Sequence, residues 1–427
     1  MIIGDWLSGN NVPTQAERPV CVAARPRLGG SHPQPAGPGM IGRMVSVFVL
    51  GFLLVVILMH AYLYRRLVHD VSASRRFRRV GLLVILLLAA STIAAIMFRL
   101  TLPAGPTAAL NWVGYLWLAL GLYLALILIV FEVPRLVLRR RRTDPGRRRA
   151  LARLLGGAAA VLAAGTVGYG AVSARSPRLA RREITLDRLD PALDGVTIAA
   201  LSDVHIGAIN RGPFLADVVR RVNAERPDLV ALVGDLVDGS VDQLGGAAGS
   251  LRELNAPTFF VTGNHEYFHD AEEWCEFLPT LGVRVLRNER VAIGRRDGGP
   301  GAPTFDLAGI DDRTAARSGE PGHGANLAKA LDGRDPARPV VLLAHQPVMV
   351  DQAARADVDL QISGHTHGGQ FLPLGYVVLL DQPVLAGLTR IGRTWLYVTR
   401  GVGFWGPPVR VGAPPEITLL TLRTPTP

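Results

Sequence analysis

Four long apolar runs, at about 45–64, 80–100, 108–131 and 150–172, dominate the first part of the 427-residue chain. Each approaches the roughly 20 residues that a helix needs to cross the hydrocarbon core of a bilayer. Four buried helices of a large soluble core are the alternative, but such helices rarely stay apolar on every side or end in arginine clusters. The pattern therefore predicts a transmembrane region of about four helices over residues 41–174.

The residues before these runs have a different character. Residues 1–40 are rich in Pro, Gly and Arg without hydrophobic periodicity, which predicts a disordered segment, and Met40 is an alternative start. Within the runs, His60 is almost the only ionisable side chain, and no repeated Gly/Pro interruption occurs. We therefore interpret the four helices as an anchor and not as a transporter with a regulatory hydrolase domain.

Arginine placement predicts the orientation in the membrane. The first connection holds six arginines and the third holds eight, whereas the second, TLPAGPT, has no charge. Basic loops tend to stay in the cytoplasm, so both chain ends and the part after the spans are expected outside the cytoplasmic membrane. Four arginines that follow the last span, from Arg175 to Arg182, argue the other way. The fourth span also has signal-peptide features that end near Ala174, and we favour its retention over cleavage.

After a polar linker at 175–194 the hydrophobic pattern changes to short runs over residues 195–427. Five runs, GVTIAALSD, DLVALVGD, PTFFVTGN, PVVLLAH and VDLQISGH, each end abruptly in Asp, Asn or His. Near-continuous apolar character is typical of strands that are buried on both faces. In open α/β sheets, catalytic and ligand-binding residues lie at the carboxyl ends of such strands. Between the first two runs, residues 211–228 have the apolar spacing of a covering helix. The pattern predicts an α/β catalytic domain.

Charge and cysteine content exclude two other classes of protein. The net charge is +11, but residues 1–182 carry 24 basic and 5 acidic side chains (+19), and the remainder carries 22 and 30 (−8). The globular part is thus acidic, which argues against nucleic acid as a partner. The two cysteines exclude a disulfide scaffold and a four-thiolate zinc site.

The polar side chains at the predicted strand ends form one constellation: Asp203, His205, Asp235, Asn264, His265, His345, His365 and His367. Singly, each is more typical of a structural residue, but together carboxylate, imidazole and amide suit Mn, Fe, Zn or a similar divalent ion. On an extended chain, Asp203 and His205 point the same way, as do His365 and His367, so each pair is expected to bind one ion. Asp235 has two oxygens with which to bridge two ions, and Gly234 allows a close turn there.

These motifs, D-x-H, GDxxD, GNHE, a lone His and GHTH in that order, resemble those of the calcineurin-like metallophosphoesterases over about 198–420. GHTHGGQ and the closing RGVGFWGPPVRVGAPPEITLLTL resemble a bacterial membrane-associated branch of that family. The resemblance implies two packed β-sheets flanked by helices and a centre of two divalent metals. It also implies that one metal is held by Asp203, His205 and His367, the other by Asn264, His345 and His365, and that Asp235 bridges them.

The resemblance also implies the chemistry, which is hydrolysis of a phosphodiester or phosphomonoester by a hydroxide that bridges two metals. Catalytic roles fall to Asp235 and to His265, which is expected to protonate the leaving oxygen; a supporting hydrogen bond is the alternative. Supporting roles around the ligands are expected for Asp238, Glu266 and Gln370. Tyr267, Phe268, Phe404 and Trp405 are candidate apolar walls, and His269 and His323 are expected at the surface.

These inferences predict a membrane-anchored, metal-dependent phosphoesterase whose substrate carries a phosphate ester. Membrane tethering favours a phospholipid or an envelope-lipid phosphate. A non-catalytic receptor or scaffold that keeps metal for stability is the alternative.

Overall fold

The computed structural model describes residues 38–99, 104–139, 144–299 and 301–425. The segment expected to be disordered, 1–40, lies outside the described residues except for its last three. By its internal contacts the chain divides into two units, Met1–Leu53 and Leu54–Pro427. In the described part of the first unit the chain is helical; all other elements belong to the second.

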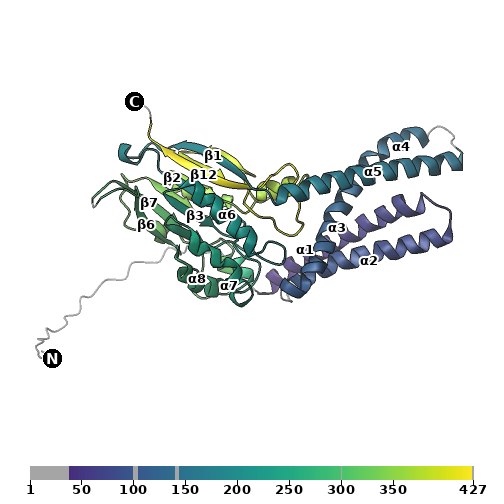
Figure 1. Cartoon of the computed structure of the whole chain (residues 1–427), viewed down its shortest axis with the longest axis horizontal. Helices are drawn as coiled ribbons and strands as arrows, with labels where there is room; N and C mark the ends of the chain where they lie inside the picture. Colours follow the sequence, from purple (N-terminus) through teal and green to yellow (C-terminus); the bar gives the residue numbers. More distant parts are fainter. Residues whose placement is uncertain (1–37, 100–103, 140–143, 300, 426–427) are drawn as a thin grey trace, which may run out of the picture. The chain divides into compact units, whose positions relative to one another are not determined.

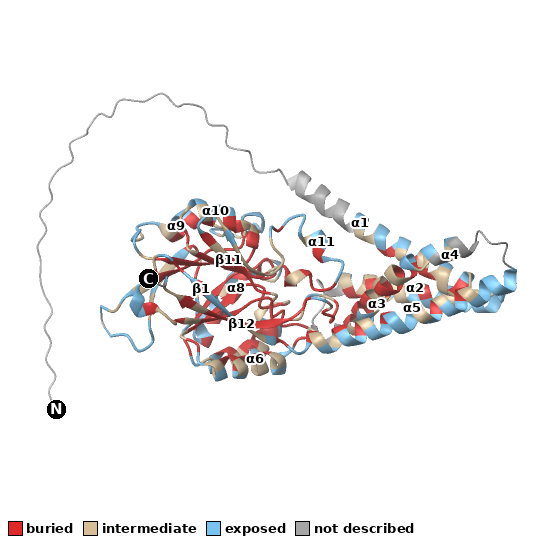
Figure 2. Cartoon of the chain, turned by 90° about the horizontal axis from the view of Figure 1, so that it is seen from above, coloured by how far each residue is buried: buried red, intermediate tan, exposed pale blue. Residues whose placement is uncertain are grey.

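The first part of the chain is helical, as predicted. Four helices are long and apolar enough to cross a membrane, at Leu50–His69, Arg75–Met97, Ala108–Val130 and Pro145–Ala174. The helices themselves are α1 (Pro38–Tyr64), α2 (Arg75–Arg99), α3 (Ala104–Val130), the short α4 (Glu132–Arg139) and α5 (Pro145–Ala174). Much of their surface is exposed in Figure 2, as expected of helices whose apolar side chains face lipid.

His60, the one histidine noted within the spans, has a structural environment. Its Nδ1 lies 2.7 Å from the Val56 carbonyl oxygen, and its Nε2 lies 2.9 Å from the indole Nε1 of Trp117. A buried polar ring with both nitrogens engaged in this way serves packing between helices. This environment supports the interpretation of the spans as an anchor.

Two six-stranded sheets follow the helices (Figure 1). The first has the order β1 (Arg178–Thr185), β12 (Glu416–Arg423), β2 (Thr197–Leu201), β3 (Leu229–Val233), β4 (Thr258–Val261) and β5 (Val283–Val285). The second has the order β10 (Gly387–Ile391), β11 (Thr394–Val398), β9 (Leu360–Ser363), β8 (Val340–Leu343), β7 (Thr304–Gly309) and β6 (Glu289–Gly294). Both sheets mix parallel and antiparallel neighbours.

One core lies between the sheets. It joins Ile198, Leu229 and Val233 of the first sheet to Val341 and Leu360 of the second. A second core covers the other face of the first sheet, where Leu215, Val218, Val219 and Val222 of α6 (Gly212–Glu225) are buried. The predicted sandwich and its covering helix are therefore confirmed. The other helices are α7 (Val241–Ala248), α8 (Ala271–Phe277), α9 (Leu327–Leu331), α10 (Val350–Arg355) and α11 (Gly375–Val378).

The range 175–194, expected to be a linker, contains strand β1. This strand pairs in parallel with β12 at the edge of the first sheet. Its sequence RLARREIT is mostly exposed, and within it only Ile184 is buried. An edge strand with so few apolar side chains has no strand pattern to detect, so the ordered sheet begins at Arg178, earlier than the sequence indicates.

The five apolar runs are confirmed as β2, β3, β4, β8 and β9. In the first sheet β2, β3 and β4 are parallel neighbours, and in the second sheet β8 and β9 are. Parallel neighbours bring their carboxyl ends to the same edge of a sheet. The motif residues that follow these strands are thereby collected in one place.

Candidate metal centre

The motif residues follow their strands in tight turns of the left-handed region. Asp203, His205, Asp235, His365 and His367 have φ values of 54°, 49°, 53°, 68° and 51°. Residues other than glycine adopt this backbone region at a cost of about 1–3 kcal/mol each, and such residues cluster at functional sites. The expectation of extended D-x-H and H-x-H segments was wrong, because each strand ends before its motif begins.

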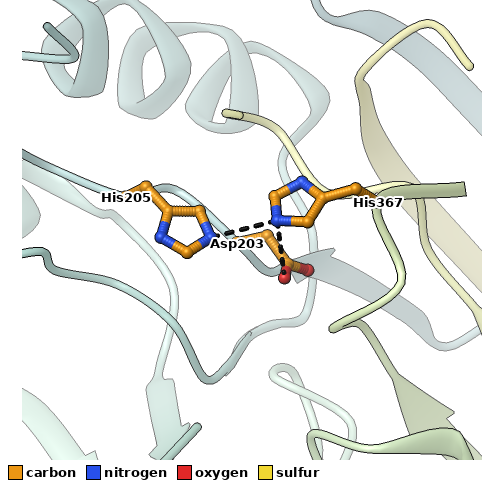
Figure 3. A group of neighbouring side chains, drawn as sticks. All are labelled: Asp203, His205 and His367. Carbon is orange, nitrogen blue, oxygen red and sulfur yellow. Dashed lines mark hydrogen bonds and ion pairs between the residues drawn. The ribbon is translucent and has the colours of Figure 1, made fainter. Parts of the chain in front are cut away.

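One group of potential ligands consists of Asp203, His205 and His367 (Figure 3), whose donor atoms lie within 4.8 Å of one another. The Nε2 atoms of the two imidazoles face each other at 3.0 Å, and the Nε2 of His367 lies 3.4 Å from Asp203 Oδ1. All three residues are buried. Burial, and then the charge of Arg410, holds the pKa of His367 well below its usual range, so this ring is in the neutral form that binds metal.

A second group consists of Asp235, His345 and His365. His345 Nε2 lies 3.1 Å from Asp235 Oδ2, while its Nδ1 lies 2.7 Å from the Val233 carbonyl oxygen, which orients the ring. Burial and the positive charge on His345 lower the pKa of His365 to about 3. The two histidines of GHTH thus belong to different groups, which contradicts the expectation that they bind one ion together.

Asp235 lies between the two groups. Its Oδ2, beside His345, is 3.9 Å from His205 Nε2, and its Oδ1 accepts a hydrogen bond from the backbone N–H of His265 at 2.9 Å. Burial alone would raise the pKa of this carboxyl, but the charges of His345 and His265 hold it well below its usual range. Asp235 is therefore ionised and faces donors from both groups.

The donor set fits a pair of divalent cations. The Asn264 Oδ1 and His365 Nδ1 atoms are buried and have no hydrogen-bond partner among the described residues. A buried polar atom without a partner costs about 1–3 kcal/mol, and a cation bound there would remove that cost. Carboxylate, imidazole and amide oxygen together are typical ligands of Mn, Fe and Zn.

Comparisons with known proteins agree with this geometry. The sequence model of the family described as Calcineurin-like phosphoesterase matches residues 196–369. An uncharacterized metallophosphoesterase of Aquifex aeolicus is 35% identical over 232 residues, which cover 53% of this chain and 85% of that protein. The chain belongs to the calcineurin-like phosphoesterase family.

Relatives of this chain also occur in animals, and one of these is named as a transmembrane protein. A transmembrane protein with metallophosphoesterase domain from Danio rerio is 39% identical over 265 residues, which cover 60% of each chain. An uncharacterized metallophosphoesterase of Helicobacter pylori is 37% identical over 250 residues, which cover 58% of this chain and 64% of that protein. The chain therefore spans about 60% of the animal relative's length, and relatives occur in bacteria and animals alike.

Asp238 and Glu266 of this phosphoesterase support the loops around the two groups. Asp238 Oδ1 lies 2.7 Å from His265 Nδ1 and 3.0 Å from His205 Nδ1, so one carboxylate orients both imidazoles. Glu266 accepts hydrogen bonds from the backbone N–H groups of Asp235, Leu236 and Gly263 at 3.0, 2.8 and 2.6 Å. Burial, and then the charge of Asp235, raises the pKa of Glu266 to about 7. Glu266 thereby ties the loop after β3 to the loop after β4.

The sequence interpretation missed Arg410, although the closing segment that contains it was noted. Its side chain is fully buried, and burial lowers its pKa to about 9. The guanidinium donates to the carbonyl oxygens of His367, Gly403 and Arg400, and it lies 2.9 Å from His367 Nδ1. Arg410 therefore fixes His367 from behind. The signal was a single charged residue, Arg410, within the otherwise uncharged and Gly/Pro-rich stretch 401–415.

The candidate apolar walls divide into two kinds. The rings of Phe268 and Trp405 lie 5.2 and 6.1 Å from the ring of His265, so both border the metal centre. Phe404 is instead buried. Gln370, expected to support ligands, holds the Trp405 segment: its Nε2 donates to the Trp405 carbonyl oxygen at 2.8 Å, and its Oε1 accepts from the Trp405 backbone N–H at 3.0 Å.

Tyr267 contacts a histidine whose burial corrects another expectation. Its hydroxyl group lies 3.0 Å from His323 Nδ1, and His323 Nε2 lies 2.7 Å from Glu272. The side chain of His323 is only 1% exposed, so the expectation of a surface residue was wrong. A histidine that falls outside every motif gives no sequence signal for such burial.

Proposed function

We propose that this phosphoesterase hydrolyses phosphate esters at a centre of two divalent cations. Asp203, His205 and His367 would hold one ion and Asn264, His345 and His365 the other. The carboxylate of Asp235 would be shared between the two ions, which makes it a catalytic residue. The observation that carries this proposal is the position of ionised Asp235 between two groups of buried donors. When bound, two such ions acidify water and neutralise phosphoryl oxygens.

In this proposal His265 protonates the leaving oxygen of the substrate. Its backbone N–H binds Asp235, and Asp238 orients its ring through Nδ1. The rings of Phe268 and Trp405 pack beside it and limit access of water to the proton. A positioned imidazole that donates its proton to a poor leaving group raises the rate by about 10²- to 10⁴-fold.

The proposal extends to location and substrate. The basic first and third connections favour a catalytic domain outside the cytoplasmic membrane. Activity, after fusion behind Pro427, of a reporter that works only in the cytoplasm would contradict this orientation. We propose a domain organisation of 1–40, 41–174, 175–194 and 195–427, with the linker range contributing β1 to the sheet. Tethering favours a phospholipid or envelope-lipid phosphate. The motifs GHTHGGQ and RGVGFWGPPVRVGAPPEITLLTL favour placement in a membrane-associated bacterial branch of the family.

Chelation tests the proposed function. The full chain, purified in detergent, is assayed on bis(4-nitrophenyl) phosphate and 4-nitrophenyl phosphate before and after treatment with a chelator. Activity is expected to fall to background and to return on addition of Mn²⁺, Fe²⁺ or Zn²⁺ singly. Hydrolysis that continues undiminished after the bound metal has been removed would contradict the proposal. The full chain is needed because a fragment that starts at Arg182 would lack half of β1.

Replacement of His265 by Ala separates acid catalysis from support. The His265→Ala variant is expected to lose about 10²- to 10⁴-fold in kcat on an alkyl phosphate ester, whose leaving oxygen needs a proton. The loss on a 4-nitrophenyl ester should be much smaller, because nitrophenolate leaves without protonation. Equal losses on both substrates would show instead that the His265 side chain only holds Asp238 in place.

A further inference from the structure

Large apolar side chains that the catalytic domain exposes are concentrated in the segment 372–380 and beside His265. Among the described residues 178–299 and 301–425 they are Phe268, Leu372, Leu374, Tyr376, Val377, Leu379, Leu380 and Trp405, which we call the apolar rim. Leu380 is 87% exposed and Tyr376 is 72% exposed. The segment 371–380, FLPLGYVVLL, has no charged side chain. A contiguous exposed apolar surface of this kind marks a site of contact with a membrane or a partner.

The backbone that leads into the rim is packed against the candidate spans. Phe371 is buried in one cluster with Ala163 and Val167 of α5, and its ring centroid lies 6.4 Å from that of Tyr123 in α3. The backbone N–H of Arg410 donates to the Gly170 carbonyl oxygen at 2.9 Å. Tyr123 and Gly170 both belong to helix segments that qualify as membrane spans. Phe371, which precedes the rim segment 372–380, therefore packs against residues that a bilayer would surround.

The rim also borders the metal centre. A Cβ placed on Gly369 would lie 2.6 Å from the Cα of Gly375, so α11 packs backbone to backbone against the turn that carries His365 and His367. On the other side, Phe268 and Trp405 lie against His265. The apolar surface and the catalytic groups are thus parts of one continuous region.

We propose that the apolar rim is immersed in the lipid layer that holds the four spans, so that the metal centre receives the phosphate group of a membrane lipid whose acyl chains stay in the bilayer. This inference rests on the proposed function and names its substrate class. The bilayer suits the rim because the rim is continuous with the spans. Its composition also fits, since Leu and Val would face acyl chains while Tyr376 and Trp405 have the amphipathic rings that are favoured at the membrane interface.

A fluorescent label tests immersion without reference to activity. In the full chain with Cys21 and Cys275 replaced by Ala, an NBD group is attached to Leu380→Cys or, as a control, to Gln352→Cys on the exposed surface of α10. The protein is placed in phosphatidylethanolamine/phosphatidylglycerol vesicles with or without doxyl-labelled lipid. The label at 380 is expected to lose most of its emission to the doxyl lipid, and the label at 352 is expected to keep its emission. Equal responses at the two positions would overturn the proposal.

Paired charge substitutions test the role of the rim in catalysis. Val377→Glu with Leu380→Glu places two charges in the rim, and Ala328→Glu with Gln352→Glu places two charges on exposed positions of α9 and α10. Because charged side chains are costly in lipid, the rim pair is expected to hydrolyse phosphatidic acid or phosphatidylglycerol in vesicles at least about tenfold more slowly than the control pair. Both pairs should hydrolyse soluble bis(4-nitrophenyl) phosphate alike.

The outcomes distinguish the two proposals. Equal rates of lipid hydrolysis by the rim pair and the control pair, or no hydrolysis of either lipid by a chain that cleaves soluble esters, would overturn the lipid substrate. A chain that cleaves neither soluble esters nor lipids with any metal would overturn the proposed function instead, and the NBD label would still decide whether the rim is immersed.

Discussion

Replacement of Asp235 by Asn is expected to lower kcat/KM for bis(4-nitrophenyl) phosphate by at least about 10³-fold. Asn keeps the size of the side chain and one oxygen but removes the negative charge that faces both groups of donors. The Oδ2 atom of Asp235 lies 3.1 Å from His345 Nε2 and 3.9 Å from His205 Nε2, so both groups lose the same partner. Bound metal, measured by mass spectrometry of the purified protein, should fall from two ions per chain to one or none.

The matched control is Asp242→Asn, which makes the same change on an exposed carboxylate of α7. It should leave kcat/KM and metal content unchanged, because exposed charges away from the site contribute little. If Asp235→Asn kept both full metal content and a rate within tenfold of the parent, Asp235 would not be shared between two ions.

Gly263 is not a proposed metal ligand, but its replacement by Ala is expected to lower activity strongly. A Cβ at this position would lie 2.5 Å from the backbone N of Asp235 and would also overlap its Oδ1. The methyl group can fit only if the loops after β3 and β4 move apart. A displacement of about 1 Å at a reacting group costs about 10²-fold in rate, and overpacking costs about 1–3 kcal/mol in stability. Both kcat/KM and the free energy of unfolding should therefore fall.

Gly246→Ala provides the control, because a Cβ there has nothing within 4 Å and the residue is exposed on α7. Within a helix this change should stabilise the protein by up to about 1 kcal/mol and leave the rate unchanged. A Gly263→Ala variant with the stability and activity of the parent would mean that the two loops are less closely packed than the structure indicates.

The sequence predicted the parts of the fold that have strong periodic signals. The four spans are long and the strands β2, β3, β4, β8 and β9 are almost fully buried, so their apolar runs are nearly continuous. Strand β1 was missed because it lies at a sheet edge and is mostly exposed. The hydrophobic pattern of such a strand does not differ from that of a polar connection.

The residues of the site could be predicted from the strand ends, but their division between two groups followed only from the resemblance to the family. Catalytic and ligand-binding residues often lie at the carboxyl ends of strands, so the motif residues could be named from the sequence alone. The argument from an extended H-x-H segment failed because His365 and His367 both lie in left-handed turns, and non-Gly residues in such turns carry no sequence signal. Arg410 and the apolar rim were missed for another reason. Their meaning depends on contacts with His367 and with the spans, which are distant in sequence.

Anomalous scattering from crystals of the Mn²⁺-loaded full chain tests the central claim most directly. Two peaks are expected, about 3.5–4 Å apart, as in other two-metal sites. One should lie among Asp203, His205 and His367, the other among Asn264, His345 and His365, with an oxygen of Asp235 beside each. A single peak, or peaks away from these residues under saturating metal, would contradict the account.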